Sequence, residues 1–250
     1  MMRLIRRAIH MGALFISVVC VMSIAILFAR SIISERTYEN LRAASLFDAS
    51  SRAGQPDSAP QDAITEHIAA WLEVEGTHIS YPVVQPAANL PRDWYLSHNV
   101  WGEWDPLGCP YLDLRCDITG QHLMVFGHHM QGTDQMFSEL SETRQQEVFD
   151  SIGAATWDTR NGTATTFDPL FALSVDASDS EIQRFTFANE GEMRSWLISL
   201  SKRAEATSPD AETLIERAAR VLTLVTCSEA QAGGRTRTLT VFVSPDTASR

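Results

Sequence analysis

A cysteine and an arginine near the C-terminus stand at the ends of two runs that read as neighbouring strands. Cys227 closes the apolar run 221–227, and Arg237 opens a second, alternating run at 238–243. In an antiparallel pair, the end of one strand lies opposite the start of the next, so the thiol and the guanidinium can face each other. Cysteine acyl transfer needs a thiolate nucleophile and positive charge where the oxyanion forms. The pair therefore predicts a cysteine acyl-transfer enzyme, provided that a histidine joins it.

Two adjacent histidines supply a candidate for the proton transfer that this chemistry requires. His128 and His129 come just after the predicted strand 122–126, so an imidazole also lies at a strand end. Chemistry alone does not choose between the two histidines. Chemistry alone also does not choose between two arginines. Arg235 lies two positions before Arg237 and projects to the same face of an extended strand.

The spacing of these residues disfavours metal and nucleotide sites. His128, His129 and Cys227 are of metal-ligand types, but adjacent histidines point in different directions, and no His-x-x-x-His or Cys-x-x-Cys spacing occurs. The glycine pair Gly233-Gly234 neither follows a dinucleotide-binding strand nor opens a helix. We predict no metal and no cofactor.

The charge distribution excludes nucleic acid as a partner. Residues 1–30 hold four of the 20 basic side chains and no acidic one, so the remaining chain carries 16 basic against 31 acidic side chains. Phosphate backbones are bound by basic patches, and a surface with this excess of carboxylates offers a poor match.

The N-terminal region has the pattern of a membrane anchor. Residues 11–29 are apolar without a charge, long enough to cross a bilayer as a helix. Three arginines in residues 1–10 favour a cytoplasmic N-terminus. The alternative, a cleaved signal peptide, has a shorter apolar core followed by a small-residue cleavage site, and residues 30–36 offer none. We predict a single-pass protein of the cell membrane with its main domain outside the cell.

The four cysteines leave one candidate nucleophile. Cys20 falls in the predicted span, whereas Cys109 and Cys116 are separated by a strand-like segment. That segment holds their ends about 23 Å apart, beyond the reach of a disulfide. We expect both thiols to stay free, so Cys227 has no obvious partner and is either buried and inert or catalytic.

The rest of the chain divides into a connector and one domain. Residues 30–62 read as a helical stalk at 35–48 and a linker at 50–62 that is rich in Ser, Ala, Pro and Asp. Residues 63–250 have the size of a single domain.

Short apolar or alternating runs bounded by turn residues predict seven or eight strands, typical of a mostly β fold that forms a closed or partly open barrel. The predicted strands are 78–84, 109–114, 122–126, 170–175, 184–187, 220–226 and 238–243, and the predicted helices are 63–72, 136–152, 190–203 and 210–219. Because the helices do not alternate with each strand, they decorate the barrel, and a doubly wound parallel sheet is disfavoured.

Taken as a set, these motifs resemble the sortases, the membrane-anchored cysteine transpeptidases of Gram-positive bacteria. Residues 223–227 (Thr-Leu-Val-Thr-Cys) match the Thr-Leu-x-Thr-Cys signature, Gly127-His128 matches the catalytic Gly-His, and Arg237 falls where the catalytic arginine opens the last strand. The resemblance implies a sortase-type barrel with His128, Cys227 and Arg237 as its catalytic residues.

Other segments are similar to class B sortases in particular. Residues 71–85 look like the family's early strand segment, and residues 94–99 look like its Tyr-Leu-x-His-Asn stretch. Residues 127–140 resemble the class B sequence after the histidine, and the predicted helix 190–203 lies where class B carries an extra helix. The resemblance covers residues 63–243.

The resemblance also implies a reaction and its partners. Cys227 attacks a C-terminal sorting signal of an exported protein to give a thioester, His128 transfers protons, and Arg237 stabilises the oxyanion or holds the substrate. The acceptor is an amino group of a peptidoglycan precursor or a pilin, and hydrolysis is the slow side path. Thr226 and Glu229, on either side of the cysteine, are expected to contact substrate, although Glu229 serves equally well to orient the site or to solvate its loop.

Two rival interpretations remain. An L,D-type cell-wall transpeptidase also uses a cysteine and a histidine, but its motif places Ser-x-Gly before the cysteine and an arginine shortly after, and neither surrounds Cys227. The second rival is a non-catalytic extracellular module with a buried Cys227 and an Arg237 that merely pairs with an acid. Rapid alkylation of Cys227 in the folded protein distinguishes an enzyme from such a module.

Overall fold

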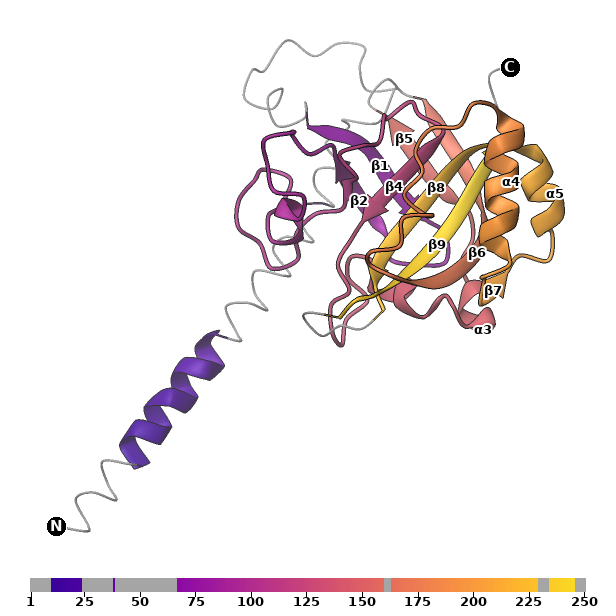
Figure 1. Ribbon diagram of the computed structural model, residues 1–250. Coiled ribbons are helices and arrows are strands. Elements are labelled where there is room, and N and C mark those ends of the chain that lie inside the picture. Colours follow the sequence, from indigo (N-terminus) through magenta and orange to yellow (C-terminus); the bar gives the residue numbers. More distant parts are fainter. Residues whose placement is uncertain (1–9, 24–37, 39–66, 160–162, 229–233, 246–250) are drawn as a thin grey trace, which may run out of the picture.

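A computed structural model describes residues 10–23, 38, 67–159, 163–228 and 234–245. Nine strands and several short helices follow one another in the main domain (Figure 1). The strands are β1 (Ile68–Val74), β2 (Ser80–Val84), β3 (Tyr111–Leu112), β4 (His122–Phe126), β5 (Ala155–Thr159), β6 (Ala164–Asp176), β7 (Ala206–Thr207), β8 (Ala218–Cys227) and β9 (Thr236–Pro245). The helices are the 3-10 turns η2 (Trp94–Leu96) and η3 (Ser138–Glu142) and the α-helices α3 (Gln146–Phe149), α4 (Glu190–Ser201) and α5 (Ala211–Arg217).

Eight of the strands close into a barrel. Their order is β5-β1-β2-β3-β4-β8-β9-β6, and a further pairing of β5 with β6 joins the two ends of this sheet. The short β7 adds to β6 outside the ring. Pairings β2–β3 and β4–β8 are parallel, and the others in the ring are antiparallel. The predicted mostly β barrel with attached helices is therefore confirmed.

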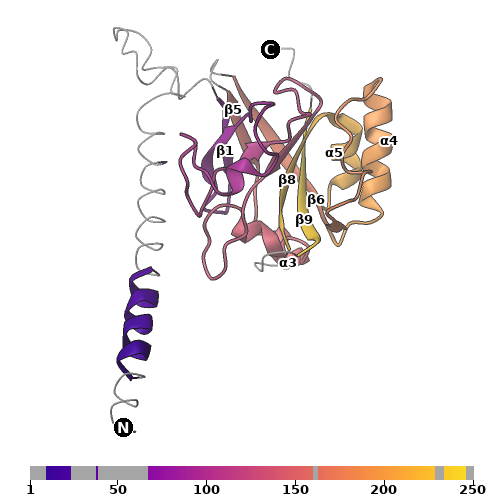
Figure 2. The ribbon, with the colours of Figure 1, turned by 60° about the vertical axis from the view of Figure 1, so that its left-hand side comes forward.

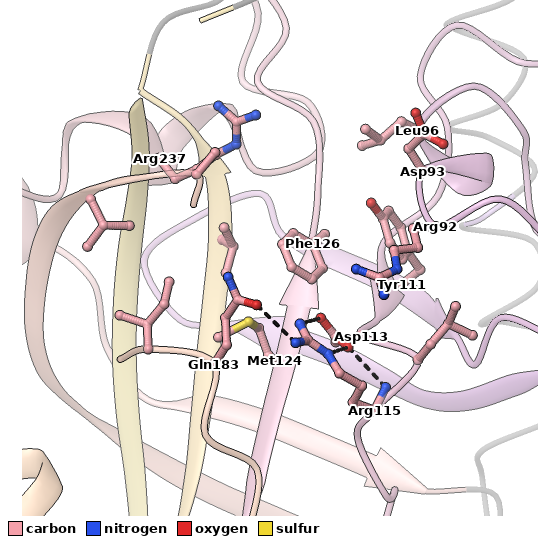
Figure 3. A pocket seen from close by; sticks show the side chains of 15 residues that line it. Arg92, Asp93, Leu96, Tyr111, Asp113, Arg115, Met124, Phe126, Gln183 and Arg237 are labelled. Carbon is pink, nitrogen blue, oxygen red and sulfur yellow. Dashed lines mark hydrogen bonds and ion pairs between the residues drawn. The ribbon is translucent and has the colours of Figure 1, made fainter. Parts of the chain in front are cut away.

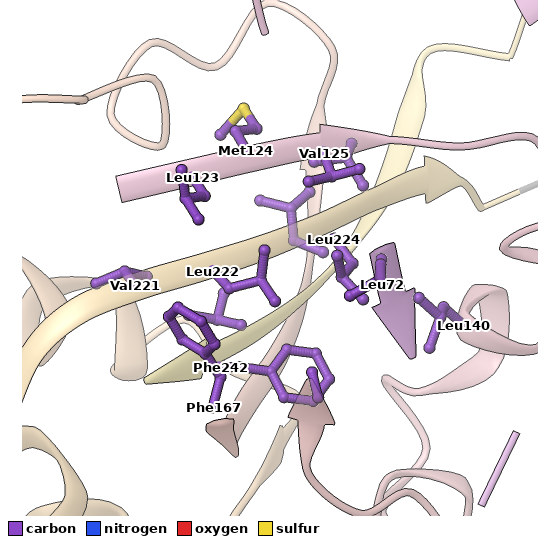
Figure 4. Packing of buried hydrophobic residues seen from close by; sticks show 14 of the residues in the cluster. Leu72, Leu123, Met124, Val125, Leu140, Phe167, Val221, Leu222, Leu224 and Phe242 are labelled. Atoms are coloured by element: carbon purple, nitrogen blue, oxygen red, sulfur yellow. The ribbon is translucent and has the colours of Figure 1, made fainter. Parts of the chain in front are cut away.

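The core fills the inside of this barrel. Side chains alternate along each strand, so residues two apart point the same way. Leu123 and Val125 of β4 meet Leu222 and Leu224 of β8 among the buried residues, whereas Met124 points to the other side of β4 (Figure 4). The outward row of β4 and β8 therefore faces away from the inside of the barrel.

Two helices cover one flank of the barrel, beside β6, β8 and β9 (Figure 2). Asn189 is the N-cap of helix α4, and its side-chain oxygen accepts a hydrogen bond from the backbone N–H of Glu192 at 2.9 Å. Its buried residues follow the spacing that a helix needs to present one apolar face; they are Met193, Trp196, Leu197 and Leu200. The predicted helices 190–203 and 210–219 are both present, with slightly shorter bounds.

The prediction of a helix at 63–72 is wrong where the structure describes that segment, because residues 68–74 form strand β1. This strand is central, pairing with β2 on one side and β5 on the other. Six of its seven residues are buried, so both faces are covered and no apolar–polar alternation is visible in Ile-Ala-Ala-Trp-Leu-Glu-Val. Without alternation, the Ala, Leu and Glu content imitates a helix.

Two further predictions of secondary structure are corrected. Segment 136–152 is broken into η3 and α3 instead of one helix, and Met136, its first residue, has a φ of 55°. The predicted strand 184–187 is an extended segment without ladder partners, because side chains of the barrel bind its backbone groups. Strand β5 and the first half of β6 were not predicted at all.

Little of the N-terminal region is described. Residues 10–23 form a helix, and no helix in the described part of the chain is both long and apolar enough to cross a membrane. Residues 24–29 of the predicted span lie outside the described residues. Tyr38, which falls in the predicted stalk, is buried, donates a hydrogen bond to the carbonyl of Gly108 at 3.1 Å and stacks on Trp101. At least this residue packs against the main domain.

The two cysteines on either side of β3 are free and buried. Burial raises the pKa of Cys109, and it raises the pKa of Cys116 to about 12. Both thiols therefore stay protonated and unreactive at neutral pH.

One buried histidine makes the stability of the fold depend on pH. His122 is 1% exposed, and burial lowers its pKa to about 4 from an ordinary 6.5. The unfolded chain binds a proton at this histidine below pH 6.5, whereas the folded chain does so only below about pH 4. Stability is therefore full above pH 6.5 and falls as the pH drops to 4, by about 3 kcal/mol for this group.

We expect the free energy of unfolding of the wild-type chain to fall more steeply between pH 6.5 and 4 than that of His122→Asn. Urea unfolding at several pH values measures both slopes. Parallel slopes for the two proteins would show that His122 titrates normally in the fold.

Candidate active site

The cysteine and the arginine meet as the hairpin predicts. Strand β8 ends at Cys227, β9 runs antiparallel to it, and the register pairs Cys227 directly with Arg237. Both residues are half-buried. The backbone N–H of Ser228 donates to the carbonyl of Thr236 at 3.2 Å, which continues the pairing one step beyond the cysteine.

The histidine loop is fixed beside the cysteine by the parallel pairing of β4 and β8. The backbone N–H of Gly127 donates to the carbonyl of Val225 at 3.0 Å, so His128 follows at the level of Cys227. A methyl group at Gly127 would lie 2.5 Å from the ring of Phe137, which explains the glycine.

The imidazole of His128 is held by one backbone carbonyl. Its Nε2 donates to the carbonyl of Leu96 at 2.6 Å, which leaves Nδ1 as the basic nitrogen. Burial lowers the pKa of His128, and the hydrogen bond to Leu96 opposes that effect. A neutral imidazole beside a thiol is suited to exchange a proton with it or with a leaving amine.

The second histidine has a different contact. Nδ1 of His129 donates to the backbone carbonyl of Cys227 at 2.9 Å. One of its nitrogens is therefore bound to the backbone of Cys227, so this ring supports the position of that residue. The arrangement favours His128 for proton transfer and His129 for holding the cysteine.

The two residues expected to contact substrate are placed differently. Thr226 is 2% exposed, and its hydroxyl donates to the carbonyl of Gly127 at 3.1 Å, which ties the histidine loop to β8. Its side chain thus faces away from the row that contains Cys227. Glu229 lies outside the described residues.

The two arginines are clearly distinguished. Arg235 is exposed, and its Nη2 and Nε lie 3.0 and 3.2 Å from the carboxylate oxygens of Asp176. Arg237 instead donates from Nη1 to the carbonyl oxygens of Gly234 and Thr236, at 2.8 and 3.1 Å, and lines a cavity. The arginine opposite the thiol is therefore Arg237.

A cavity of about 350 Å³ leads to this group of residues (Figure 3). Arg237 lies at one side of it and Leu96 with Asp93 at the other, above a floor that contains Asp113 and Arg115. Residues from six separate stretches of the sequence line it: Arg92, Asp93, Leu96, Tyr111, Asp113, Leu114, Arg115, Met124, Phe126, Val175, Ala177, Ile182, Gln183, Val225 and Arg237.

Strand alternation explains why the cysteine opens onto this cavity. Phe126 of β4 and Val225 of β8 are paired in register and both line the cavity. Cys227 lies two residues beyond Val225, so its side chain projects to the same face of the sheet. Arg237, opposite Cys227, also lines the cavity. The thiol therefore stands at the end of a groove large enough for several peptide residues.

The floor of the cavity is a polar network that the sequence did not reveal. Arg115 binds both carboxylate oxygens of Asp113, at 2.8 and 2.6 Å, and donates from Nη1 to the side-chain oxygen of Gln183 at 2.9 Å. Arg115 holds the pKa of Asp113 below its usual range against the effect of burial. The opposing charges neutralise each other, so the floor offers shape and dipoles more than net charge.

Two side chains in the cavity wall keep unused polar groups. Among the described residues, none hydrogen-bonds the phenol of Tyr111 or the guanidinium of Arg92. Burial raises the pKa of Tyr111, and the carboxylates of Asp93 and Asp113 raise it further. Tyr111 is thus a neutral hydrogen-bond donor in the wall of the cavity.

The described ranges contain no group of three or more His, Cys, Asp or Glu residues with the geometry to hold a metal ion.

Comparison with known proteins agrees with this geometry. No protein-family model matches the chain. Sortase B of Staphylococcus aureus (strain NCTC 8325 / PS 47) is 24% identical over 178 residues, which cover 70% of this chain and 69% of that protein.

Solved structures share the fold. The structure of Clostridium perfringens sortase B has 26% identity and a TM-score of 0.63, covering 74% of this chain and 97% of that one. A Staphylococcus aureus sortase B–substrate complex has 22% identity and a TM-score of 0.67, covering 86% of this chain and 97% of that one. The Cys, His and Arg of the sequence motifs thus stand at one end of a barrel that these enzymes also have, and the chain is similar to class B sortases, which are cysteine transpeptidases, both in its sequence motifs and in its fold.

Proposed function

We propose that this transpeptidase cleaves a C-terminal sorting signal of exported proteins and joins the released carboxyl group to an amine of the cell wall or of a pilin. The observation that carries the proposal is the pairing of Cys227 with Arg237 at the end of a peptide-sized cavity, beside the histidine loop. No cofactor takes part in the steps that follow.

In the first half of the reaction, His128 accepts the proton of Cys227, and Sγ attacks the carbonyl carbon of the scissile peptide bond. The carbonyl oxygen becomes an oxyanion, which the guanidinium of Arg237 stabilises. The C–N bond then breaks, and His128 donates its proton to the departing amine. The products are a thioester at Cys227 and the released C-terminal segment of the substrate.

In the second half, an amine replaces the released segment. His128 takes a proton from the incoming amine as its nitrogen attacks the thioester carbonyl, and Arg237 again stabilises the oxyanion. Collapse breaks the C–S bond, forms a new amide and returns the proton to the thiol. Water in place of the amine gives hydrolysis, the slower side reaction.

The cavity is the proposed site for the residues of the sorting signal that precede the scissile bond. Its groove runs from the Asp113–Arg115 floor to Arg237, and its walls offer the phenol of Tyr111 and the guanidinium of Arg92. A related Staphylococcus aureus sortase B has been solved with its substrate. Thr226 fixes the histidine loop in this scheme and does not contact the peptide.

The proposed location is the outer face of the cell membrane. The apolar residues 11–29 and the three preceding arginines support an anchor with a cytoplasmic N-terminus. An enzyme held there meets exported substrates as they leave the membrane.

Incubating the chain with a panel of sorting-signal peptides and an amine acceptor tests the proposal. We expect one or more peptides to be cleaved, an acyl-enzyme at Cys227 to be visible by mass spectrometry, and added amine to divert product from hydrolysis to transfer. Failure of all peptides to acylate Cys227 would favour the non-catalytic module.

Thiol labelling supplies an independent control for that outcome. Cys109 and Cys116 are buried thiols with raised pKa values, so they serve as internal standards for an inert cysteine. A functional Cys227 alkylates in the folded protein well before either of them. Equal, slow labelling of all three thiols until denaturant is added would contradict an active-site cysteine.

A further inference from the structure

One wall of the cavity is a segment without helix or strand. Residues 177–189 connect β6 to α4, and Ala177, Ile182 and Gln183 from this segment line the cavity. A wall of this kind has no ladder of backbone hydrogen bonds to hold its shape, so its backbone groups need other partners.

Side chains from the barrel and from α4 supply those partners. On the α4 side, Nε1 of Trp196 donates to the carbonyl of Glu181 at 2.8 Å, and Arg203 binds the carboxylates of Asp179 and Glu181. On the barrel side, the side-chain oxygen of Gln121 accepts from the backbone N–H of Phe187 at 3.0 Å.

The most buried of these contacts belongs to His122. Its Nδ1 lies 2.7 Å from the carbonyl of Arg184, and its Nε2 lies 2.8 Å from the hydroxyl of Thr223 on β8. A carbonyl only accepts, so Nδ1 carries the proton, and the hydroxyl of Thr223 donates to Nε2. The ring stacks on Phe185 at 5.6 Å and packs against Trp196 at 5.1 Å.

His122 also stands in the row of side chains that forms the cavity. It precedes Met124 and Phe126 on the outward face of β4, and its partner Thr223 precedes Val225 and Cys227 on the outward face of β8. The imidazole therefore joins the two catalytic strands to the backbone of the wall, one residue beyond Gln183.

We propose that His122 is a positioning residue, which fixes the cavity wall 177–189 through the carbonyl of Arg184 and so preorganises the site for the sorting peptide. It touches no substrate. Its effect is to keep Ile182 and Gln183 in place before the peptide binds, so the peptide does not have to order the wall itself. The low pKa of the buried ring keeps it neutral and both bonds intact at neutral pH.

Two substitutions of His122 separate the wall contact from the contact within the sheet. The side-chain amide of His122→Asn reaches about as far as Nδ1, so it can still donate to the carbonyl of Arg184. The longer side-chain amide of His122→Gln reaches about as far as Nε2. This variant therefore keeps a hydrogen-bond partner for Thr223 but loses the hydrogen bond to the carbonyl of Arg184 in the wall. Both variants remove the same ring, so a merely structural role would affect them alike.

The first readout does not depend on catalysis. Trypsin cleaves after arginine, and the bond between Arg184 and Phe185 lies in the wall at the carbonyl that His122 binds. In the native full chain we expect His122→Gln to be cleaved at this bond about tenfold faster than wild type, and His122→Asn within about threefold of it. Cleavage after Arg217, at the end of α5, is the reference bond that should not change.

The second readout rests on the proposed function. For a cleaved sorting peptide we expect KM to rise about tenfold in His122→Gln and less than about threefold in His122→Asn, with kcat nearly unchanged in both. The alkylation rate of Cys227 should stay at the wild-type value, since the thiol is not altered.

The outcomes are separable. Equal trypsin sensitivity of the two variants at Arg184 overturns the inference. Faster cleavage of His122→Gln at Arg184 together with an unchanged KM for the sorting peptide also overturns it. If wild type cleaves no sorting peptide, the proposed function fails, while the trypsin comparison still decides whether His122 holds the wall.

Discussion

Replacing Cys227 with alanine lowers the rate of sorting-peptide cleavage by at least about 10⁴-fold, because the substitution removes the sulfur atom that forms the thioester in the proposed reaction. Arg237, the histidine loop and the cavity remain in place, so the variant should still bind the peptide with a dissociation constant close to that of wild type. Mass spectrometry of the intact protein after mixing with peptide should show no acyl adduct. Steady-state cleavage and a binding titration measure the two quantities separately.

The matched control is Cys20→Ala, which removes a thiol from the N-terminal helix without touching the barrel. It should cleave peptide at the wild-type rate. Residual activity of Cys227→Ala within tenfold of wild type would mean that another group is the nucleophile, and the interpretation of the β8–β9 hairpin would then be wrong.

The parts of the site that the sequence predicts correctly are those fixed by local pattern. Cys227 and Arg237 lie at the ends of consecutive strands joined by a short connection, so their pairing follows from alternation and chain direction. Helix α4 was predicted because its apolar residues repeat at helical spacing. These features need no knowledge of distant contacts.

The parts that the sequence does not predict depend on contacts between distant segments. Gln183 meets Arg115 across 68 residues, and Arg184 meets His122 across 62. No rule of sequence spacing connects such pairs, so the floor and the wall of the cavity could not be predicted from the sequence. His122 read as an ordinary strand residue, and the extended run at 184–187 read as a strand because its alternation is real but its backbone partners are side chains.

Burial on both faces explains why a helix was predicted at 63–72, where the structure has strand β1. Strand β1 has neighbours on each side and loses the alternation that identifies a half-exposed strand. The choice between Arg235 and Arg237 was open for a different reason, since an ideal strand sends side chains two residues apart to the same face. In the structure β9 begins at Thr236, Arg237 lines the cavity and Arg235 binds Asp176 instead, so we propose Arg237 as the arginine that serves the oxyanion.

This difference between the arginines leads to the second large effect. Arg237→Ala should lower kcat/KM for peptide cleavage by about 10² to 10³-fold, the usual loss when one group that stabilises an oxyanion is removed. The kcat/KM of Arg237→Lys should lie between the values of wild type and Arg237→Ala, because lysine keeps the charge but lacks the planar fork of donors. Steady-state kinetics on one sorting peptide compare the three proteins.

Arg235→Ala is the matched control, since it removes the same side chain two residues away on the same segment. Arg235 is exposed and already bound to Asp176, so its loss should change kcat/KM by less than about threefold, as expected for a solvent-screened pair. If Arg235→Ala were the more damaging change, the guanidinium that serves the oxyanion would have to leave Asp176 during the reaction, and the register of Cys227 with Arg237 would not be what places the charge.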